Sequence, residues 1–387
     1  MDEPTRILIQ AIHDSPPRAV FAAAGAGSRA LADLLAVPGA SRTLLEALIP
    51  YAADSFDEFL GQRPEQYVSA ETGRLMAGRA LARAHHLREL ETFPIVGLAC
   101  TATIVTDRPK RGEHRAHVAA WTPGRLTAWT VYLEKGARDR AGEEGLVSNL
   151  ILDALAEACG ITGRPPLPTG PGDALSAETV DFTTVAEQLR RREIPYFGIH
   201  ADGRVRTTDA HPQVILSGSF NPLHAGHTGL ADTAAALLGK PVAFEVSAVN
   251  VDKPPLATDV LLDRMSQFAG SRAVFAANAP TYVEKSRLYP GATFVVGFDT
   301  AARIIHPRYY GDSEADMLAA LAEMRDRGNR FLVAGREGED GRFRELHELA
   351  IPEGFAGLFA AIPARLFRND VSSTEIRAAL KEEVEES

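Results

Sequence analysis

The chain has 387 residues, more than one hydrophobic core usually organises, so two domains are expected. Hydrophobic residues make up 45% of the chain and charged residues 24%, which is typical of a globular protein. The formal net charge is −10 and no long Lys or Arg run occurs, which argues against a nucleic-acid-binding surface. A local basic pocket for phosphates remains compatible with this composition.

The cysteines and the N-terminus indicate the compartment. Cys100 and Cys159 have neither a metal-binding spacing nor the pattern of a disulfide framework, as expected in a reducing compartment. The acidic N-terminus does not resemble a signal peptide, and no apolar run is long enough to cross a membrane. We therefore expect a cytoplasmic protein without a membrane partner.

Residues 1–160 are predicted to form the first domain. Helical periodicity covers 28–35 and 71–86, and Ser69 is suited to cap the second of these helices. Further along, apolar runs predict strands at 95–100, 117–121 and 126–133 and a closing helix at 147–158.

A Pro- and Gly-rich stretch, GITGRPPLPTGPGD at 160–173, is typical of a domain connection. We therefore predict a linker over 161–210. Within it, the runs 194–200 and 205–208 flank Asp202-Gly203 and suggest a hairpin.

From residue 211 to 387 the pattern becomes an alternation of strands and helices. This alternation predicts an α/β fold with a Rossmann-like, doubly wound parallel sheet, whose ligands bind at the carboxyl ends of the strands. The predicted strands are 214–216, 242–249, 273–277, 293–296, 330–334 and 358–362, and the predicted helices are 227–238, 257–269, 316–326 and 374–382.

The segment GSFNPLHAGH, Gly218 to His227, lies where such a sheet presents a ligand, between a strand and a helix. Gly218 lets the backbone approach a phosphate, and Gly226 keeps the helix start free of side-chain bulk. His224 and His227 are three residues apart and can face one ligand, beside the free N–H groups of the helix N-terminus. Each part alone also suits an ordinary turn, a capping histidine or a metal pair, but their joint occurrence favours a triphosphate site.

The segment VSSTEIR, Val371 to Arg377, is the second candidate. Ser372 and Glu375 have capping-box spacing and could simply start the last helix. That interpretation leaves Ser373, Thr374 and Arg377 unexplained, whereas a phosphate clamp would use them. Both interpretations can hold together.

Together, these two motifs resemble the HxGH nucleotidyltransferase superfamily, and within it the nicotinamide or nicotinic acid mononucleotide adenylyltransferases. The resemblance covers roughly residues 213–380. It implies attack of an acceptor phosphate on the α-phosphate of ATP, with Mg²⁺ accompanying the triphosphate and pyrophosphate leaving. The implied nucleotide-contacting residues are His224, His227 and Arg377 as catalytic groups and Gly218, Ser219, Phe220, Asn221, Gly226, Ser372, Ser373 and Thr374 as binding groups.

Two weaker sites follow predicted strands. Gly297 and Asp299 resemble the GxD segment of this superfamily, although Asp299 could equally cap the next helix. Lys253 could bind an acceptor phosphate or be a solvated loop lysine. The family's Trp for stacking on a pyridine ring is missing from 302–310, where the candidates are His306, Tyr309 and Tyr310.

Residues 5–158 resemble the CinA C-terminal domain, a nicotinamide mononucleotide deamidase fold. The resemblance rests on VPGASR at 37–42, VSAET at 68–72, MAG at 76–78 and, more weakly, GARDR at 136–140. The position of the family's nucleophilic Ser is Ala24, Tyr51 is kept, and Phe56 replaces its Lys. Ser28 could be a displaced nucleophile, but its neighbour Arg29 is a poor base. Without a nucleophile and a base to activate it, we expect no deamidase activity.

The sequence therefore predicts an adenylyl-transferring enzyme that acts on ATP and a pyridine mononucleotide. Transfer from CTP, or to another phosphorylated metabolite, stays open, as does a nucleotide-binding regulator without turnover. The N-terminal domain could bind a ligand or build a homo-oligomer.

Overall fold

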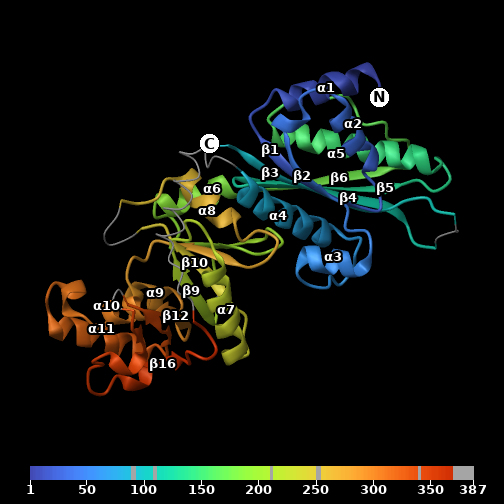
Figure 1. The fold of residues 1–387 in the computed structure, drawn as a ribbon. Helices are drawn as coiled ribbons and strands as arrows, with labels where there is room; N and C mark the ends of the chain where they lie inside the picture. The colour runs from blue at the N-terminus through green and yellow to red at the C-terminus, as the bar shows by residue number, and fades with distance from the viewer. Residues whose placement is uncertain (89–92, 108–110, 210–211, 250–253, 339–340, 369–387) are drawn as a thin grey trace. The chain divides into compact units, whose positions relative to one another are not determined.

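The structure is a computed structural model that describes residues 1–88, 93–107, 111–209, 212–249, 254–338 and 341–368 (Figure 1). The chain forms two compact units. The first comprises Met1–Val185, Ile199–Val205 and Met265–Ala273, and the second comprises Ala186–Gly198, Arg206–Arg264 and the chain from Val274 onward. Each unit has its own sheet.

The segment predicted as a linker, 161–210, carries regular structure. It contains β6 (Ala174–Asp181), α6 (Phe182–Arg190), β7 (Tyr196–Ile199) and β8 (Val205–Arg206). β6 is the edge strand of the first unit's sheet, and β7 and β8 are neighbours in the second sheet, where the hairpin was predicted.

The first unit is built on a six-stranded mixed sheet in the order β2-β1-β3-β4-β5-β6. β1 pairs in parallel with β2 and β3, and the strands from β3 to β6 form an antiparallel meander. Its first five strands are β1 (Arg18–Ala24), β2 (Leu44–Leu48), β3 (Ile95–Thr103), β4 (His114–Thr122) and β5 (Arg125–Leu133).

Helices cover both faces of this sheet (Figure 1). One face carries α1 (Glu3–His13), α2 (Ser28–Ala36) and α5 (Arg140–Ala158), and their apolar side chains form one buried cluster with the strands. The other face carries α4 (Ala70–Leu87), with α3 (Ala53–Leu60) against it. α4 begins at the predicted cap, because the Ser69 side chain accepts a hydrogen bond from the Thr72 N–H at 3.1 Å.

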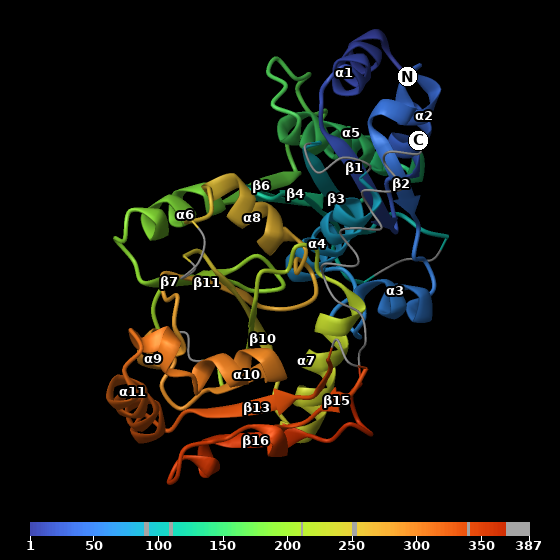
Figure 2. The same ribbon diagram turned by 60° about the vertical axis from the view of Figure 1, so that its left-hand side comes forward.

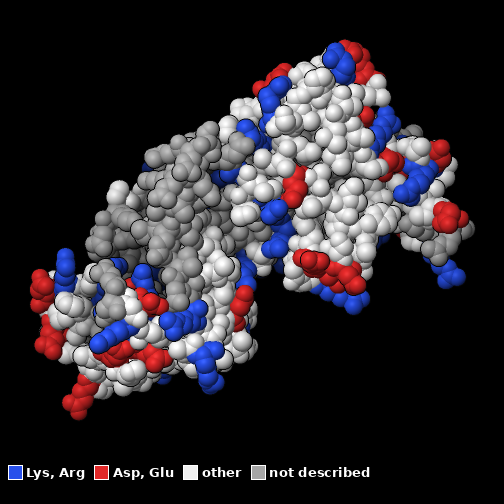
Figure 3. Space-filling model, in the orientation of Figure 1, with Lys and Arg blue, Asp and Glu red and all other residues white. Residues whose placement is uncertain are grey.

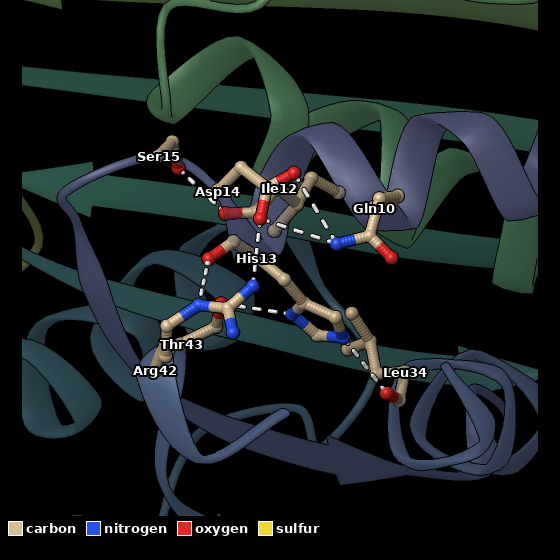
Figure 4. Close-up of polar contacts among 8 residues, drawn as sticks. All are labelled: Gln10, Ile12, His13, Asp14, Ser15, Leu34, Arg42 and Thr43. Atoms are coloured by element: carbon tan, nitrogen blue, oxygen red, sulfur yellow. Dashed lines mark hydrogen bonds and ion pairs between the residues drawn. The ribbon is translucent and has the colours of Figure 1, made fainter. Parts of the chain in front are cut away.

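A polar cluster ties the end of α1 to the loop before β2 (Figure 4). The buried His13 ring lies 2.9 Å from the Thr43 hydroxyl and 3.0 Å from the Leu34 carbonyl oxygen. Arg42 donates to the His13 carbonyl at 3.0 Å and to the Asp14 carboxylate at 2.6 Å. Arg42 of the VPGASR segment is therefore engaged in holding the fold.

The second unit contains a parallel sheet whose strand order reverses once. The order is β16-β13-β12-β9-β10-β11, and all five pairings are parallel. The chain runs outward from β9 to β10 and β11, then returns to β12 on the other side of β9. The strands are β9 (Val214–Gly218), β10 (Ala243–Ser247), β11 (Val274–Ala277), β12 (Thr293–Gly297), β13 (Arg330–Ala334) and β16 (Phe359–Ile362).

Helices follow these strands along the chain (Figure 2). They are α7 (Ala225–Leu238), α8 (Thr258–Ser266), α9 (Tyr282–Leu288), α10 (Phe298–Ile304) and α11 (Glu314–Asp326). The predicted fold class, α/β with a Rossmann-like parallel sheet in the C-terminal part, is confirmed. The helix predicted at 374–382 lies outside the described residues.

Two surface observations complete the fold. Basic and acidic side chains are interspersed on the face shown in Figure 3. Within the described ranges, no helix has the length and apolar character needed to cross a membrane.

Gly97 of β3 lets α4 approach the sheet closely. A Cβ atom at this position would lie 2.0 Å from the Ala77 carbonyl oxygen and 2.3 Å from the Leu81 nitrogen, both backbone atoms of α4. We expect Gly97→Ala to lower the free energy of unfolding by about 2 kcal/mol or more, because the helix must move away from its core. Chemical denaturation measures this loss. Gly112→Ala is the matched control, since no atom lies within 4 Å of a Cβ there, and an equal loss in both variants would contradict the argument.

Candidate functional site

The turn between β9 and α7 is held by Phe220. Its ring is 1% exposed and packs edge-on against Phe244 and His227, with ring centroids 5.3 Å and 5.0 Å away. A Cβ on Gly218 would lie 2.8 Å from the Phe220 ring, so glycine is needed for the ring to fold back under the loop. The loop then returns through a cis Asn221–Pro222 peptide to the start of α7 at Ala225.

The structure brings His224 and His227 together at the N-terminus of α7. Their ring centroids are 3.7 Å apart and their planes differ by 30°. The His224 backbone N–H donates to Nδ1 of His227 at 3.4 Å, which leaves the ring proton of a neutral His227 on Nε2. Gly226 lies between them in the first helical turn.

Both histidines favour their neutral forms. Burial, with a smaller contribution from the neighbouring His224 charge, lowers the pKa of His227 to about 4. Burial also lowers the pKa of His224. At neutral pH the free protein therefore presents imidazole N–H donors at this helix start and not a pair of cations.

A cavity of about 480 Å³ begins at the same loop. It lies at the carboxyl ends of β9 and β10, at the reversal of strand order where parallel sheets bind ligands. Its wall combines loop residues, apolar and aromatic side chains, and a few cationic or hydroxyl groups; these include Ser217, Gly218, Ser219, Ser247, Leu256, Val260, Arg264, Thr281, Tyr282, Lys285, Thr300, Arg303, Ile304, Tyr309 and Tyr310. Neither histidine is part of this wall.

A buried ion pair forms part of the cavity wall. Lys285 of α9 is 2% exposed, and its ammonium donates to the carboxylate of Glu245, which is 0% exposed, on β10. The same ammonium donates to the Ser247 hydroxyl at 2.8 Å. Lys285 and Ser247 line the cavity, whereas Glu245 stands behind them.

The GxD segment follows β12. Gly297 ends the strand and is the N-cap residue of α10, so the alternative role of Asp299 as that cap is wrong. Asp299 instead forms an ion pair with Arg336 of the short β14 (Arg336–Glu337). Tyr310, in the stretch where the family has a Trp, lines the cavity and donates to the Ile304 carbonyl at 2.9 Å.

Several predicted site residues lie outside the described residues. These are Lys253 and the whole second motif, including Ser372, Ser373, Thr374 and Arg377. Their roles stay predictions.

Sequence reasoning missed Lys285, Glu245, Arg264 and Arg303. A signal existed for the first two. Glu245 is a lone charge inside the apolar run 242–249, and Thr281 with Glu284 forms the capping box that starts α9 beside it. A charge in a buried strand requires a partner, and α9, two helices further along the chain, supplies one.

In the first unit, a carboxylate fills the position where a helix start could bind a ligand. Oε1 of Glu144 accepts hydrogen bonds from the Gly27 and Arg29 N–H groups and from the hydroxyls of Ser28 and Ser148, at 3.0–3.3 Å. The Ser28 hydroxyl therefore shares this carboxylate oxygen with three other donors.

Of the three other positions compared with the deamidase family, two hold apolar residues and one holds an exposed tyrosine. Ala24 ends β1 and carries no nucleophile, and Tyr51 is 70% exposed. Phe56, in place of the family's Lys, is buried and packs edge-on against Tyr67.

The arginines of GARDR, candidates for a retained phosphate site, are engaged within the fold. Arg138 pairs with Asp173 at 2.6 Å. Arg140 donates to the Val105 carbonyl at 2.6 Å.

Potential metal ligands are dispersed. Across the described parts of the chain, no three His, Cys, Asp or Glu residues gather in a way that could hold a metal ion.

Comparison of the sequence with protein families identifies the C-terminal region. Residues 215–379 match the sequence model of the cytidylyltransferase-like family. This region is therefore a nucleotidyltransferase domain, as its motifs predicted. A search among curated proteins finds no match.

Comparison with solved structures finds similarity to CinA-type proteins for the N-terminal part. A competence/damage-inducible protein from Agrobacterium tumefaciens has 17% identity, covers 41% of this chain and 94% of its own, and has a TM-score of 0.30. A competence or damage-inducible protein from Enterobacter asburiae has 18% identity, covers 41% of this chain and 95% of its own, and has a TM-score of 0.32. Competence damage-inducible protein A from Klebsiella pneumoniae has 17% identity, covers 40% of this chain and 95% of its own, and has a TM-score of 0.32. Similarity at this level carries no conclusion about activity.

The lowered pKa of His227 predicts a pH-dependent contribution to stability. Because the folded pKa is about 4 and the unfolded value is near 6.5, protons bind the unfolded chain more tightly. The contribution is full above pH 6.5 and is lost as the pH falls toward 4. Between pH 7 and pH 5, we expect the wild type to lose about 2 kcal/mol more unfolding free energy than His227→Gln.

Urea denaturation at the two pH values measures this difference. His347→Gln is the control because His347 is exposed. That variant should lose as much stability as the wild type, and an identical loss in His227→Gln would show that His227 titrates normally.

Proposed function

We propose that the C-terminal domain transfers the adenylyl group of ATP to the phosphate of a nicotinamide or nicotinic acid mononucleotide and releases pyrophosphate. One observation carries this proposal: the loop that places His224 and His227 at the start of α7 also forms the wall of the cavity. A triphosphate at the helix start and an acceptor in the cavity would then meet at Ser219.

The residues of this chain would act by positioning and by electrostatics. The N–H groups at the start of α7 attract phosphate oxygens. Neutral His227 would donate from Nε2 to an oxygen of the triphosphate and stabilise the charge that develops as pyrophosphate leaves. The acceptor phosphate, held near Ser219 and Arg264, would supply the attacking oxygen.

We further propose that Mg²⁺ enters with ATP. Since the described residues provide no cluster of three ligands, phosphate and water oxygens would supply most of its coordination. The ion would reduce repulsion between the triphosphate and the incoming acceptor phosphate.

The acceptor class follows from the cavity together with the resemblance of the sequence. Tyr282, Val260 and Ile304 provide flat and apolar surface for a ring, while Arg264 and Arg303 supply positive charge for a phosphate. Cytidylyl transfer, another phosphorylated acceptor and a regulator without turnover remain as alternatives for the experiment to separate.

Pyrophosphate release tests the proposal. Purified protein with Mg²⁺ would receive ATP or CTP and, in turn, nicotinamide mononucleotide, nicotinic acid mononucleotide, phosphopantetheine or phosphocholine. We expect release with ATP and a pyridine mononucleotide, reduced about 10²–10³-fold in His227→Ala because one transition-state donor is lost.

His347→Ala serves as the control, since it removes an exposed imidazole from the same domain. Release with CTP or with another acceptor would reassign the substrate. ATP binding without release for any pair would favour a regulator.

The first unit is expected to release no ammonia from nicotinamide mononucleotide, because Ala24 has no nucleophilic oxygen and Phe56 no basic group. A coupled glutamate dehydrogenase assay on the full chain measures this directly. Ammonia release that Ser28→Ala abolishes would instead assign Ser28 as a nucleophile.

A further inference from the structure

The buried side of the cavity presents a hydrogen-bond donor. The Lys285 ammonium has three N–H bonds. It donates to the carboxylate of Glu245 and to Ser247 Oγ, and the Tyr282 ring centroid lies 6.0 Å from the ammonium, so among the described residues two hydrogen-bond acceptors serve its three N–H bonds. Because Lys285 lines the cavity, the remaining N–H is available to a ligand.

The charge of this donor is already balanced. Glu245 and Lys285 are 0% and 2% exposed, so water screens neither of them effectively. A ligand carbonyl would accept a hydrogen bond from the remaining N–H without adding charge. A ligand carboxylate would place a second negative charge beside Glu245 with only one buried cation between them, which is unfavourable in such surroundings.

Among the described residues, Arg264 and Arg303 also line the cavity. Arg264 donates to the Ser219 carbonyl oxygen at 3.4 Å, next to the catalytic loop, and Arg303 is exposed on α10. Both are placed to meet the phosphate of an acceptor.

We propose that Lys285, Ser247 and Glu245 select an acceptor mononucleotide whose planar ring bears a neutral carboxamide over one whose ring bears a carboxylate. Lys285 donates to the amide oxygen, and Glu245 is a positioning residue that holds and neutralises Lys285. This inference rests on the proposed function and narrows its substrate class.

The test uses two ligands that differ only in this group, nicotinamide mononucleotide and nicotinic acid mononucleotide. Isothermal titration calorimetry on the full chain measures both affinities. We expect the wild type to bind the amide about tenfold more tightly or better. Glu245→Gln keeps the shape but removes the negative charge, so the ratio of amide to acid affinity should fall about tenfold.

Glu323→Gln is the matched control. Glu323 pairs with Arg287 at 2.8 Å on the surface of the same unit and is not part of the cavity wall, and its replacement changes the net charge by the same amount. The affinity ratio should stay at the wild-type value in this variant. Thermal unfolding of each variant establishes that it is folded.

If the single variant does not fold, Glu245→Gln combined with Lys285→Met removes both buried charges and keeps the test. It should weaken amide binding about tenfold because the donor is gone. Equal wild-type affinities, a preference for the acid, binding of neither ligand, or an unchanged ratio in Glu245→Gln would overturn the inference. So would unchanged amide binding in the double variant.

The failure of the proposed function looks different. An amide preference in calorimetry, with no pyrophosphate released from ATP in the presence of either mononucleotide, would contradict adenylyl transfer and leave the ring selectivity in place. Pyrophosphate release from ATP with both mononucleotides, bound with equal affinity, would contradict the ring selectivity and leave adenylyl transfer in place.

Discussion

The parallel pairing of β9 with both β10 and β12 is the constraint on which the candidate site depends. Since the chain leaves β9 toward β10 and later returns to β12, the connections after these strands diverge and leave a space between them. The loop with Gly218 and Ser219 enters that space from β9, Ser247 from β10, and α10 after β12. Phe220 fixes the loop by packing beneath it, which sets where α7 and its two histidines begin.

The buried pair of Glu245 and Lys285 follows from the same geometry. Two charges inside a domain are often less stabilising than apolar residues of similar size, so burial alone does not account for them. Their placement does: Glu245 lies on the strand whose end reaches the cavity, and Lys285 lies on the helix that closes it. Tyr289 and Tyr282 surround the carboxylate, and their burial, with the Glu245 charge, raises their pKa. These phenols thus stay protonated next to a fixed negative charge.

The sequence was most informative where local chemistry decides the structure. The Ser69 cap, the end of α7 at Leu238 and the apolar runs of the parallel strands were each predicted, because capping and periodicity depend on neighbouring residues. The strand β6, missed in the segment 161–210, depends on a partner far along the chain. β6 is an edge strand with mostly exposed residues, so it has no apolar pattern, and only its pairing with β5 defines it. The pairing of Glu245 with Lys285 likewise joins positions forty residues apart.

The two units use a helix start in opposite ways. In the first unit, Gly27, Ser28 and Arg29 at the start of α2 donate to the internal carboxylate of Glu144. An anionic ligand there would have to displace that carboxylate and would meet its charge. In the second unit, the start of α7 carries two neutral histidines, and the first turn has no acidic residue. The first unit thus fills its helix start with an internal carboxylate, whereas the described start of α7 carries neutral imidazoles and no acidic side chain.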